Sequence, residues 1–186
     1  MKESIKSFLN KLLFLSIILF IFSCGEDDKN ANDPLLGYYT ISKSVLTSEC
    51  SSQDGAVTLP AGTDVTAEIL NAFLSDIVCT STTDKAIEIS DNGKIFFVCR
   101  VEGKKQDQGT WAINAERTEL TLTLVIQGSP IPLKLTGFTE SSTKISGNVA
   151  SIPVPPLLLS TVESLFSGVT DQAILISIDI DLEKLN

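Results

Sequence analysis

Short runs of alternating apolar and polar residues, separated by turn-forming residues, fill the chain from residue 35 onward. Successive side chains of a β-strand point to opposite faces, so this alternation predicts strands with one buried face. The last run is the clearest, with isoleucine or leucine at every second position from Ile174 to Leu182. An all-β domain is therefore expected. Its eight predicted strands lie at residues 36–47, 86–90, 94–101, 109–114, 119–127, 132–138, 143–150 and 172–183.

Two segments depart from this alternation and have helical spacing. In residues 64–78, apolar residues recur every three or four positions, and Thr63 or Asp64 is suited to cap the helix N-terminus. In residues 156–166, a proline suited to the first helical turn precedes a second apolar face. The sequence thus predicts two short helices inserted among the strands.

The first two dozen residues have the pattern of a bacterial leader peptide. Three lysines precede an apolar run at residues 12–22, which only Ser16 interrupts. This run is shorter than the roughly 20 residues that span a bilayer as a helix, and it has the length of the apolar part of a signal peptide. The tetrad Ile21-Phe22-Ser23-Cys24 resembles the lipobox of bacterial lipoproteins. An ordinary signal peptide or a short N-terminal anchor is the alternative interpretation.

The lipobox resemblance implies cleavage before Cys24 and lipid on that residue, where two or three acyl chains would anchor the protein to a membrane. Residues 25–34 are polar and acidic, as expected for a flexible tether. An acidic cluster here resembles the surface-export signal of Bacteroidota lipoproteins, and a solvated linker on a protein of the inner face is the alternative. The expected location is the outer membrane of the cell envelope. The expected parts are a signal peptide at 1–23, a tether with lipidated Cys24 at 24–34, and one domain at 35–186.

Charge and composition narrow the function classes. Removing residues 1–23 takes away three lysines and one glutamate, which leaves 11 basic and 22 acidic residues and a net charge of −11. A surface this acidic repels nucleic acid, whose binding depends on Lys and Arg. The chain has no histidine, which excludes Ser-His-Asp and Cys-His catalysis and zinc sites that contain histidine.

Several short motifs resemble those of a known family. Gly37-Tyr38-Tyr39 opens the first predicted strand, Asp91-Asn92-Gly93 joins the second to the third, and Gly109-Thr110-Trp111 opens the fourth. An alternating leucine strand at residues 119–127 follows. This order resembles that of lipocalin-like lipoproteins of Bacteroidota, in which Gly-x-Trp stands at both glycine positions; here Tyr39 replaces the first tryptophan. The resemblance covers most of residues 35–150.

An eight-stranded up-and-down lipocalin-like barrel fits both the strand count and the resemblance. In this topology the two helical insertions share one mouth of the barrel, and the tether lies at the other end. The helices would form either a movable lid or a plug that completes the core, and the plug is the favoured interpretation. Tyr39, Phe97 and Trp111 are candidate ligand-lining residues, with core packing as the alternative.

Three cysteines remain after Cys24, enough for one disulfide in an oxidising compartment. Cys50 and Cys79 flank the first predicted helix and are the favoured pair. Cys99 alternates in phase with Phe97 and Val101, so it is expected to face inward as a free thiol. A metal site built from these thiols is disfavoured.

The remaining carboxylates show no catalytic pattern. Asp179, Asp181 and Glu183 share the polar face of the last predicted strand, as expected for a solubility stripe. The predicted function is a membrane-anchored, non-catalytic barrel that binds a small apolar ligand, without a metal or another cofactor. The alternative is a plugged barrel that serves as a structural or protein-interaction module of the cell envelope.

Overall fold

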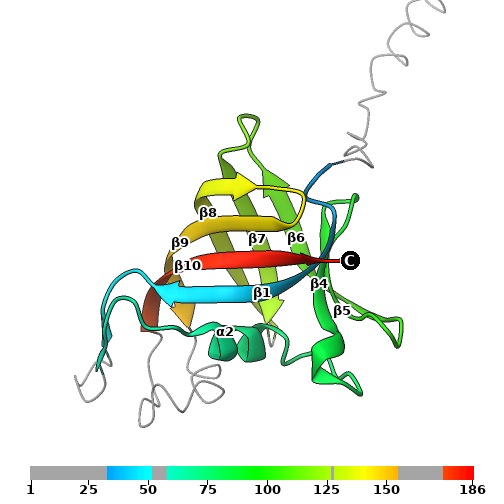
Figure 1. Ribbon diagram of the computed structural model, residues 1–186, viewed down its shortest axis with the longest axis horizontal. Helices are drawn as coiled ribbons and strands as arrows, with labels where there is room; N and C mark the ends of the chain where they lie inside the picture. Colours follow the sequence, from blue (N-terminus) through cyan, green and yellow to red (C-terminus); the bar gives the residue numbers. More distant parts are fainter. Residues whose placement is uncertain (1–32, 52–57, 127, 155–173) are drawn as a thin grey trace, which may run out of the picture.

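Eight antiparallel strands close into one barrel in the computed structural model, which describes residues 33–51, 58–126, 128–154 and 174–186 (Figure 1). Around the barrel the order is β1-β10-β9-β8-β7-β6-β5-β4, and pairing of β1 with β10 joins the two ends of the sheet. The predicted all-β, up-and-down barrel is confirmed. The barrel strands are β1 Gly37–Leu46, β4 Lys85–Ile89, β5 Lys94–Cys99, β6 Lys104–Ile113, β7 Glu119–Ile126, β8 Ser129–Glu140, β9 Lys144–Val154 and β10 Ile174–Leu185.

The connection between β1 and β4 contains the remaining elements. Two short strands, β2 Cys50–Ser51 and β3 Thr58–Leu59, pair with each other, and the helix α2 Thr66–Phe73 follows. A 3-10 turn, η1 Thr82–Asp84, leads into β4. The first predicted helix is therefore confirmed but shorter, and its N-terminal capping residue is neither Thr63 nor Asp64. The second predicted helix, at residues 156–166, lies outside the described residues.

Alternation along the strands explains why the barrel closes around an apolar interior. On β10, Ile178, Ile180 and Leu182 are buried, whereas Asp179 and Glu183 are exposed and Asp181 is half-buried. The predicted outer carboxylate stripe is thus confirmed. Inward side chains from all eight strands join those of α2 in one hydrophobic cluster.

Strand limits differ from the predicted ones at the turn between β5 and β6. Cys99 ends β5 and pairs with Lys104, so residues 100–103 form the turn. Val101 lies in this turn and is 89% exposed, so its predicted inward orientation was wrong. Gly103 has a positive φ of 67°, which suits a tight reversal. β6 consequently begins five residues before its predicted start at residue 109.

Antiparallel order assigns the connections to the two ends of the barrel. The α2 end contains the connection from β1 to β4 and the turns that follow β5 and β7. The opposite end contains residues 33–36 and the turns after β4, β6 and β8. Figure 1 shows α2 along the lower rim, beside β1. The predicted separation of α2 from the N-terminal side of the domain is confirmed, and the described helices are all too short to cross a membrane.

The glycine of each Gly-x-aromatic motif has a steric role. Gly109 has a φ of 143°, and a Cβ there would stand 1.9 Å from the carbonyl oxygen of Thr123 on β7. A Cβ on Gly37 would stand 2.5 Å from the Lys184 side chain on β10. At Gly109 the clash is with backbone and requires glycine, whereas at Gly37 the flexible Lys184 side chain can move aside and it is the φ of 144° that favours glycine. Trp111 and Tyr39 of the two motifs both point into the barrel.

Candidate functional site

The described side chains that face the barrel interior, which the sequence marks as the binding site, are almost fully buried. Tyr39 is 1% exposed, Phe97 is 0% exposed and Trp111 is 3% exposed. All three belong to the single hydrophobic cluster. Solvent-accessible area includes the walls of any internal cavity large enough for water, so walls of a ligand cavity would retain exposed area. The three candidate ligand-lining residues are therefore placed together, as core.

The polar atoms of these aromatic residues are bound by the barrel's own backbone. The Tyr39 hydroxyl donates a hydrogen bond to the carbonyl oxygen of Leu35 at 3.0 Å. The Trp111 indole nitrogen donates to the carbonyl oxygen of Ser90 at 2.7 Å. Buried tyrosine and tryptophan usually find such partners within the protein. Neither contact requires a ligand.

At one end of the interior, the inner face of α2 packs into the core. Ile69, Ala72 and Phe73 are buried on its inner face, and Leu74 and Ile77 continue this apolar surface beyond its last turn. The side chain of Asp64 accepts a hydrogen bond from the Thr66 amide at 2.9 Å, which stabilises the start of the helix. These contacts support the predicted plug, because the inner face of α2 is part of the core.

At the other end, the N-terminal segment at residues 33–36 covers the barrel. Leu35 is fully buried in the core cluster. The Arg117 guanidinium donates to both carboxylate oxygens of Asp33 at 3.0 Å, and to Glu140 at 2.7 and 2.8 Å. Bidentate pairs of this kind fix geometry as well as charge. Arg117 thus links the start of the domain to the turn after β6 and to the end of β8.

This ion cluster lies close to Tyr39 and affects its titration. Burial, followed by the negative charges of Glu140 and Asp33, raises the pKa of Tyr39 to about 12. Hydrogen bonds to Glu140 and Asp33 raise the pKa of Arg117, so the cation persists. The sequence does not predict this cluster, because Asp33 lies in the segment expected to be a tether, 84 positions before Arg117 and 107 positions before Glu140. A lone arginine between two strands gave no signal of its partners.

The disulfide joins different cysteines from those expected. Cys79 is bonded to Cys99, and Cys50 is a buried free thiol. The predicted Cys50–Cys79 pair was wrong because α2 carries the chain across the mouth of the barrel. Cys50 lies beside β10, with its thiol 3.8 Å from the carbonyl oxygen of Leu175, whereas Cys79 reaches the end of β5. Burial raises the pKa of the Cys50 thiol, which disfavours its reactive thiolate form.

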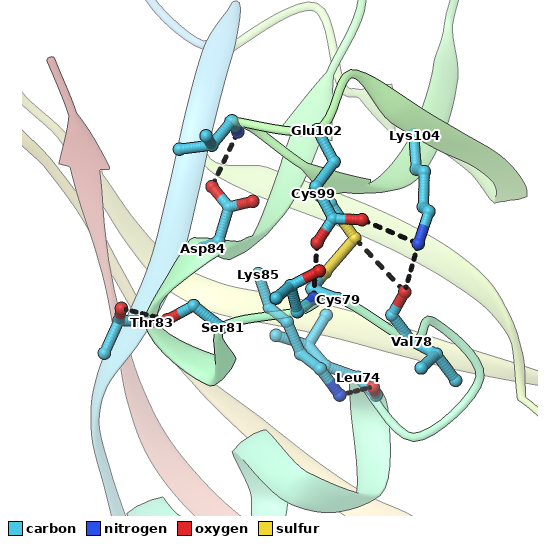
Figure 2. Close-up of a disulfide and its surroundings, with 12 residues drawn as sticks. Leu74, Val78, Cys79, Ser81, Thr83, Asp84, Lys85, Cys99, Glu102 and Lys104 are labelled. Carbon is cyan, nitrogen blue, oxygen red and sulfur yellow. Dashed lines mark hydrogen bonds and ion pairs between the residues drawn. A yellow bond between two sulfur atoms is a disulfide. The ribbon is translucent and has the colours of Figure 1, made fainter.

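Hydrogen bonds and ion pairs surround the disulfide and hold the β5–β6 turn in place (Figure 2). Glu102 forms an ion pair with Lys104 at 2.6 Å and accepts a hydrogen bond from the Thr80 amide. These contacts lower the pKa of Glu102 to about 2. Asp84 is buried, and its carboxylate accepts a hydrogen bond from the Val101 amide at 2.7 Å. The turn is therefore fixed to the segment that leads from α2 to β4.

A surface groove of about 600 Å³ lies next to this disulfide, on the outside of the barrel. The Tyr38 ring lies in it, with the guanidinium of Arg100 5.6 Å from the ring centre. Lys105 forms an ion pair with Glu88 across the groove at 2.8 Å. Because the lysine and the glutamate pair with each other, neither presents an unpaired charge to a ligand. Among the described residues, no cluster of three or more Cys, Asp or Glu side chains is placed to bind a metal ion.

Comparisons with known proteins give little support for a specific activity. No family model matches the sequence, and no curated protein matches it. Among solved structures, the chain is similar to a polyisoprenoid-binding domain from Saccharophagus degradans that is implicated in plant cell wall breakdown. The two are 15% identical, with 81% of this chain and 99% of that domain covered and a TM-score of 0.32. The barrel assignment therefore depends on the strand order of this chain itself.

Proposed function

We propose that this chain is a lipid-anchored protein of the bacterial cell envelope. We further propose that its filled lipocalin-like barrel is a non-catalytic interaction module that acts through its outer surface. The lipobox-like tetrad that ends at Cys24 supports the anchor. The observation that supports an interaction module is the near-complete burial of the side chains inside the barrel, which leaves the outer surface for binding.

An eight-stranded barrel has an interior just wide enough either to be filled by side chains or to hold one small ligand. Ligand pockets usually enclose about 300–1,000 Å³. In this chain the alternate, inward-facing residues of β7 are 0–4% exposed (Leu120, Leu122, Leu124 and Ile126), and Phe97 on β5 is 0% exposed. The described side chains therefore favour the filled barrel over a preformed ligand cavity.

The test of the filled barrel is native mass spectrometry of residues 25–186, purified without detergent. We expect the mass of the polypeptide less the two hydrogens of one disulfide, with no second component. A small-molecule mass that leaves only on denaturation would contradict the filled barrel.

A small apolar ligand is the second candidate, and one observation favours it. The buried inner wall is apolar, and the side chains of α2 occupy the mouth through which such a ligand would enter. Withdrawal of Phe73 and its neighbours would expose an apolar surface. In the same experiment, a co-purifying apolar compound would support this candidate.

The anchor has its own test. We expect Cys24→Ser to abolish labelling of the chain by radioactive fatty acid and to remove the protein from the membrane fraction, because the thioether cannot form. Ser23→Ala is the matched control, since it keeps a small residue immediately before the cysteine. If Cys24→Ser remained fully labelled, the anchor would be refuted.

A further inference from the structure

The strand β6 extends beyond one of its two neighbours. It pairs with β5 from Lys104 to Thr110, but with β7 only from Gly109 to Ile113. Within the described part of the chain, residues 104–108 therefore have a strand partner on one side only. Such an edge presents backbone N–H and C=O groups to any extended segment that approaches it.

Pairing of β6 with β7 ends at Gly109, opposite Leu124, where the backbones are so close that a Cβ would clash with the Thr123 carbonyl. The register with β5 also shifts here, between Ile95 and Phe96. Gln108 is buried, and its side chain donates a hydrogen bond to Asp76 at 3.1 Å. The exposed part of the free edge is therefore residues 104–107.

Another edge of the same barrel is interrupted by prolines. Within the described residues, 129–134 of β8 pair with β7 but not with β9. Pro130 and Pro132 lie in that stretch and cannot donate backbone hydrogen bonds. Residues 104–108 of β6 contain no proline, so each backbone amide of that stretch retains its N–H group.

The charges along the β6 edge are self-complementary. Lys105 and Asp107 lie on either side of Gln106, and residues 104–107 are exposed. If a second copy is placed antiparallel with Gln106 opposite Gln106, each Lys105 faces an Asp107. If the two-fold axis passed through Lys105 or through Asp107, that residue would face its own copy, and two like charges opposite each other destabilise a strand pair.

Nearby ion pairs would extend this arrangement into a network. Lys105 is 2.8 Å from Glu88, and Asp107 is 2.9 Å from Lys94. Both partners lie on the β5 side of β6, opposite the free edge, but the side chains of Lys105 and Asp107 are 43% and 52% exposed, so each can also meet a charge of the second copy. Lysine on an edge usually discourages pairing, but here the opposing aspartate of a second copy would neutralise it.

We propose that two copies of this chain associate through their β6 edges, related by a two-fold axis at Gln106. The partner is a second copy because the edge is complementary to itself, as an isologous interface requires. Backbone pairing between residues 105–107 of the two copies joins the barrels, and the Lys105–Asp107 contacts set the register. This inference is independent of the proposed function, since it depends only on strand pairing and charge.

Charge reversal in the full chain, purified in a mild detergent, tests this dimer. Light scattering coupled to size-exclusion chromatography should show a dimer whose dissociation constant rises about tenfold in Lys105→Asp and in Asp107→Lys. In a dimer of either single variant, residues 105 and 107 have the same charge, so two pairs of like charges would face each other across the interface. An equimolar mixture of the two variants, and the double variant, should both regain dimerisation because unlike charges again face each other.

The control is Glu116→Lys, which reverses an exposed charge in the turn after β6, away from the free edge. It should dimerise like the unmodified chain. An unmodified chain that stays monomeric, or a dimer that is insensitive to either single reversal, would overturn the proposal. So would single variants whose dimerisation neither the mixture nor the double variant restores.

Discussion

At the scale of single residues, the structure assigns packing roles to side chains that the sequence marked as ligand-lining. Tyr39 and Trp111 follow close-approach glycines and point inward, where their polar atoms bind the backbone of the same barrel. The motif pattern specifies an inward aromatic side chain, and this is equally compatible with a cavity wall and with a filled core. The near-zero exposure of Phe97 distinguishes the two.

The substitution Phe97→Ala tests whether this side chain is packed in a filled core or lines a cavity. We expect the free energy of unfolding to fall by about 3–5 kcal/mol, because the substitution empties part of a packed core. Its neighbour Phe96 is half-buried on the outer face beside Lys105, so Phe96→Ala is the matched control and should cost about 1 kcal/mol. Urea unfolding gives both values. A Phe97→Ala chain about as stable as the control would indicate a cavity wall instead.

Tyr39 makes stability depend on pH in the alkaline range. Its pKa is about 12 in the folded chain against the ordinary tyrosine value of 10.0, so the folded state retains the phenolic proton more tightly than the unfolded state. This contribution to stability is complete below pH 10 and is lost as the pH rises from 10 to 12.

Tyr39→Phe should remove that part of the alkaline loss, at a cost of about 1 kcal/mol near neutral pH for the missing hydrogen bond. Urea unfolding at a series of pH values measures both effects. An equally steep alkaline loss in the phenylalanine variant would show that other groups are responsible.

At the scale of elements, the path of the chain through α2 determines what the cysteines do. The helix crosses the α2 end of the barrel and delivers Cys79 to β5, while Cys50 remains beside β10. Sequence distance favoured the cysteines that flank the helix. Pairing depends instead on which strand end each cysteine reaches, and that is a property of the folded path.

Replacing both Cys79 and Cys99 with serine should lower the free energy of unfolding by about 3 kcal/mol, because the bond closes a loop over a sequence separation of 20 residues. Cys50→Ala is the control and should retain the disulfide. Thermal unfolding with and without a reductant provides the measurement. Reductant sensitivity that disappears in Cys50→Ala would instead show that Cys50 takes part in the disulfide.

At the scale of the whole molecule, both ends of the barrel are closed by segments outside its eight strands. One end is covered by α2, and the other by residues 33–36, which Arg117 holds in place. Side chains from α2 and from this N-terminal segment belong to the same hydrophobic cluster as the barrel. The domain is therefore expected to unfold as one unit.

Phe73→Ala tests whether α2 belongs to that unit. If α2 is a plug, the variant should lose about 3 kcal/mol, and its transitions by Trp111 fluorescence and by circular dichroism should shift together. Asn71→Ala alters the exposed face of the same helix and should leave both transitions almost unchanged. A Trp111 transition that does not move in Phe73→Ala would identify α2 as a separately opening lid.

The sequence by itself determined the barrel. Alternation with a period of two specifies which face of each strand is buried, and the count of eight strands together with the lipocalin-like motifs predicted the up-and-down order. The inward positions of Tyr39, Phe97 and Trp111 followed from the same alternation. These features are local, since each depends on residues that are close together in the chain.

Only the tertiary structure decided the remaining features. Pairing of Cys79 with Cys99, the binding of Asp33 by Arg117 and the free edge of β6 all depend on how distant segments meet. Whether the interior is filled depends on the summed volume of side chains from eight strands and a helix, which no single segment encodes. Periodicity thus assigns a side chain to a face of the sheet, and packing in three dimensions determines what that side chain contacts.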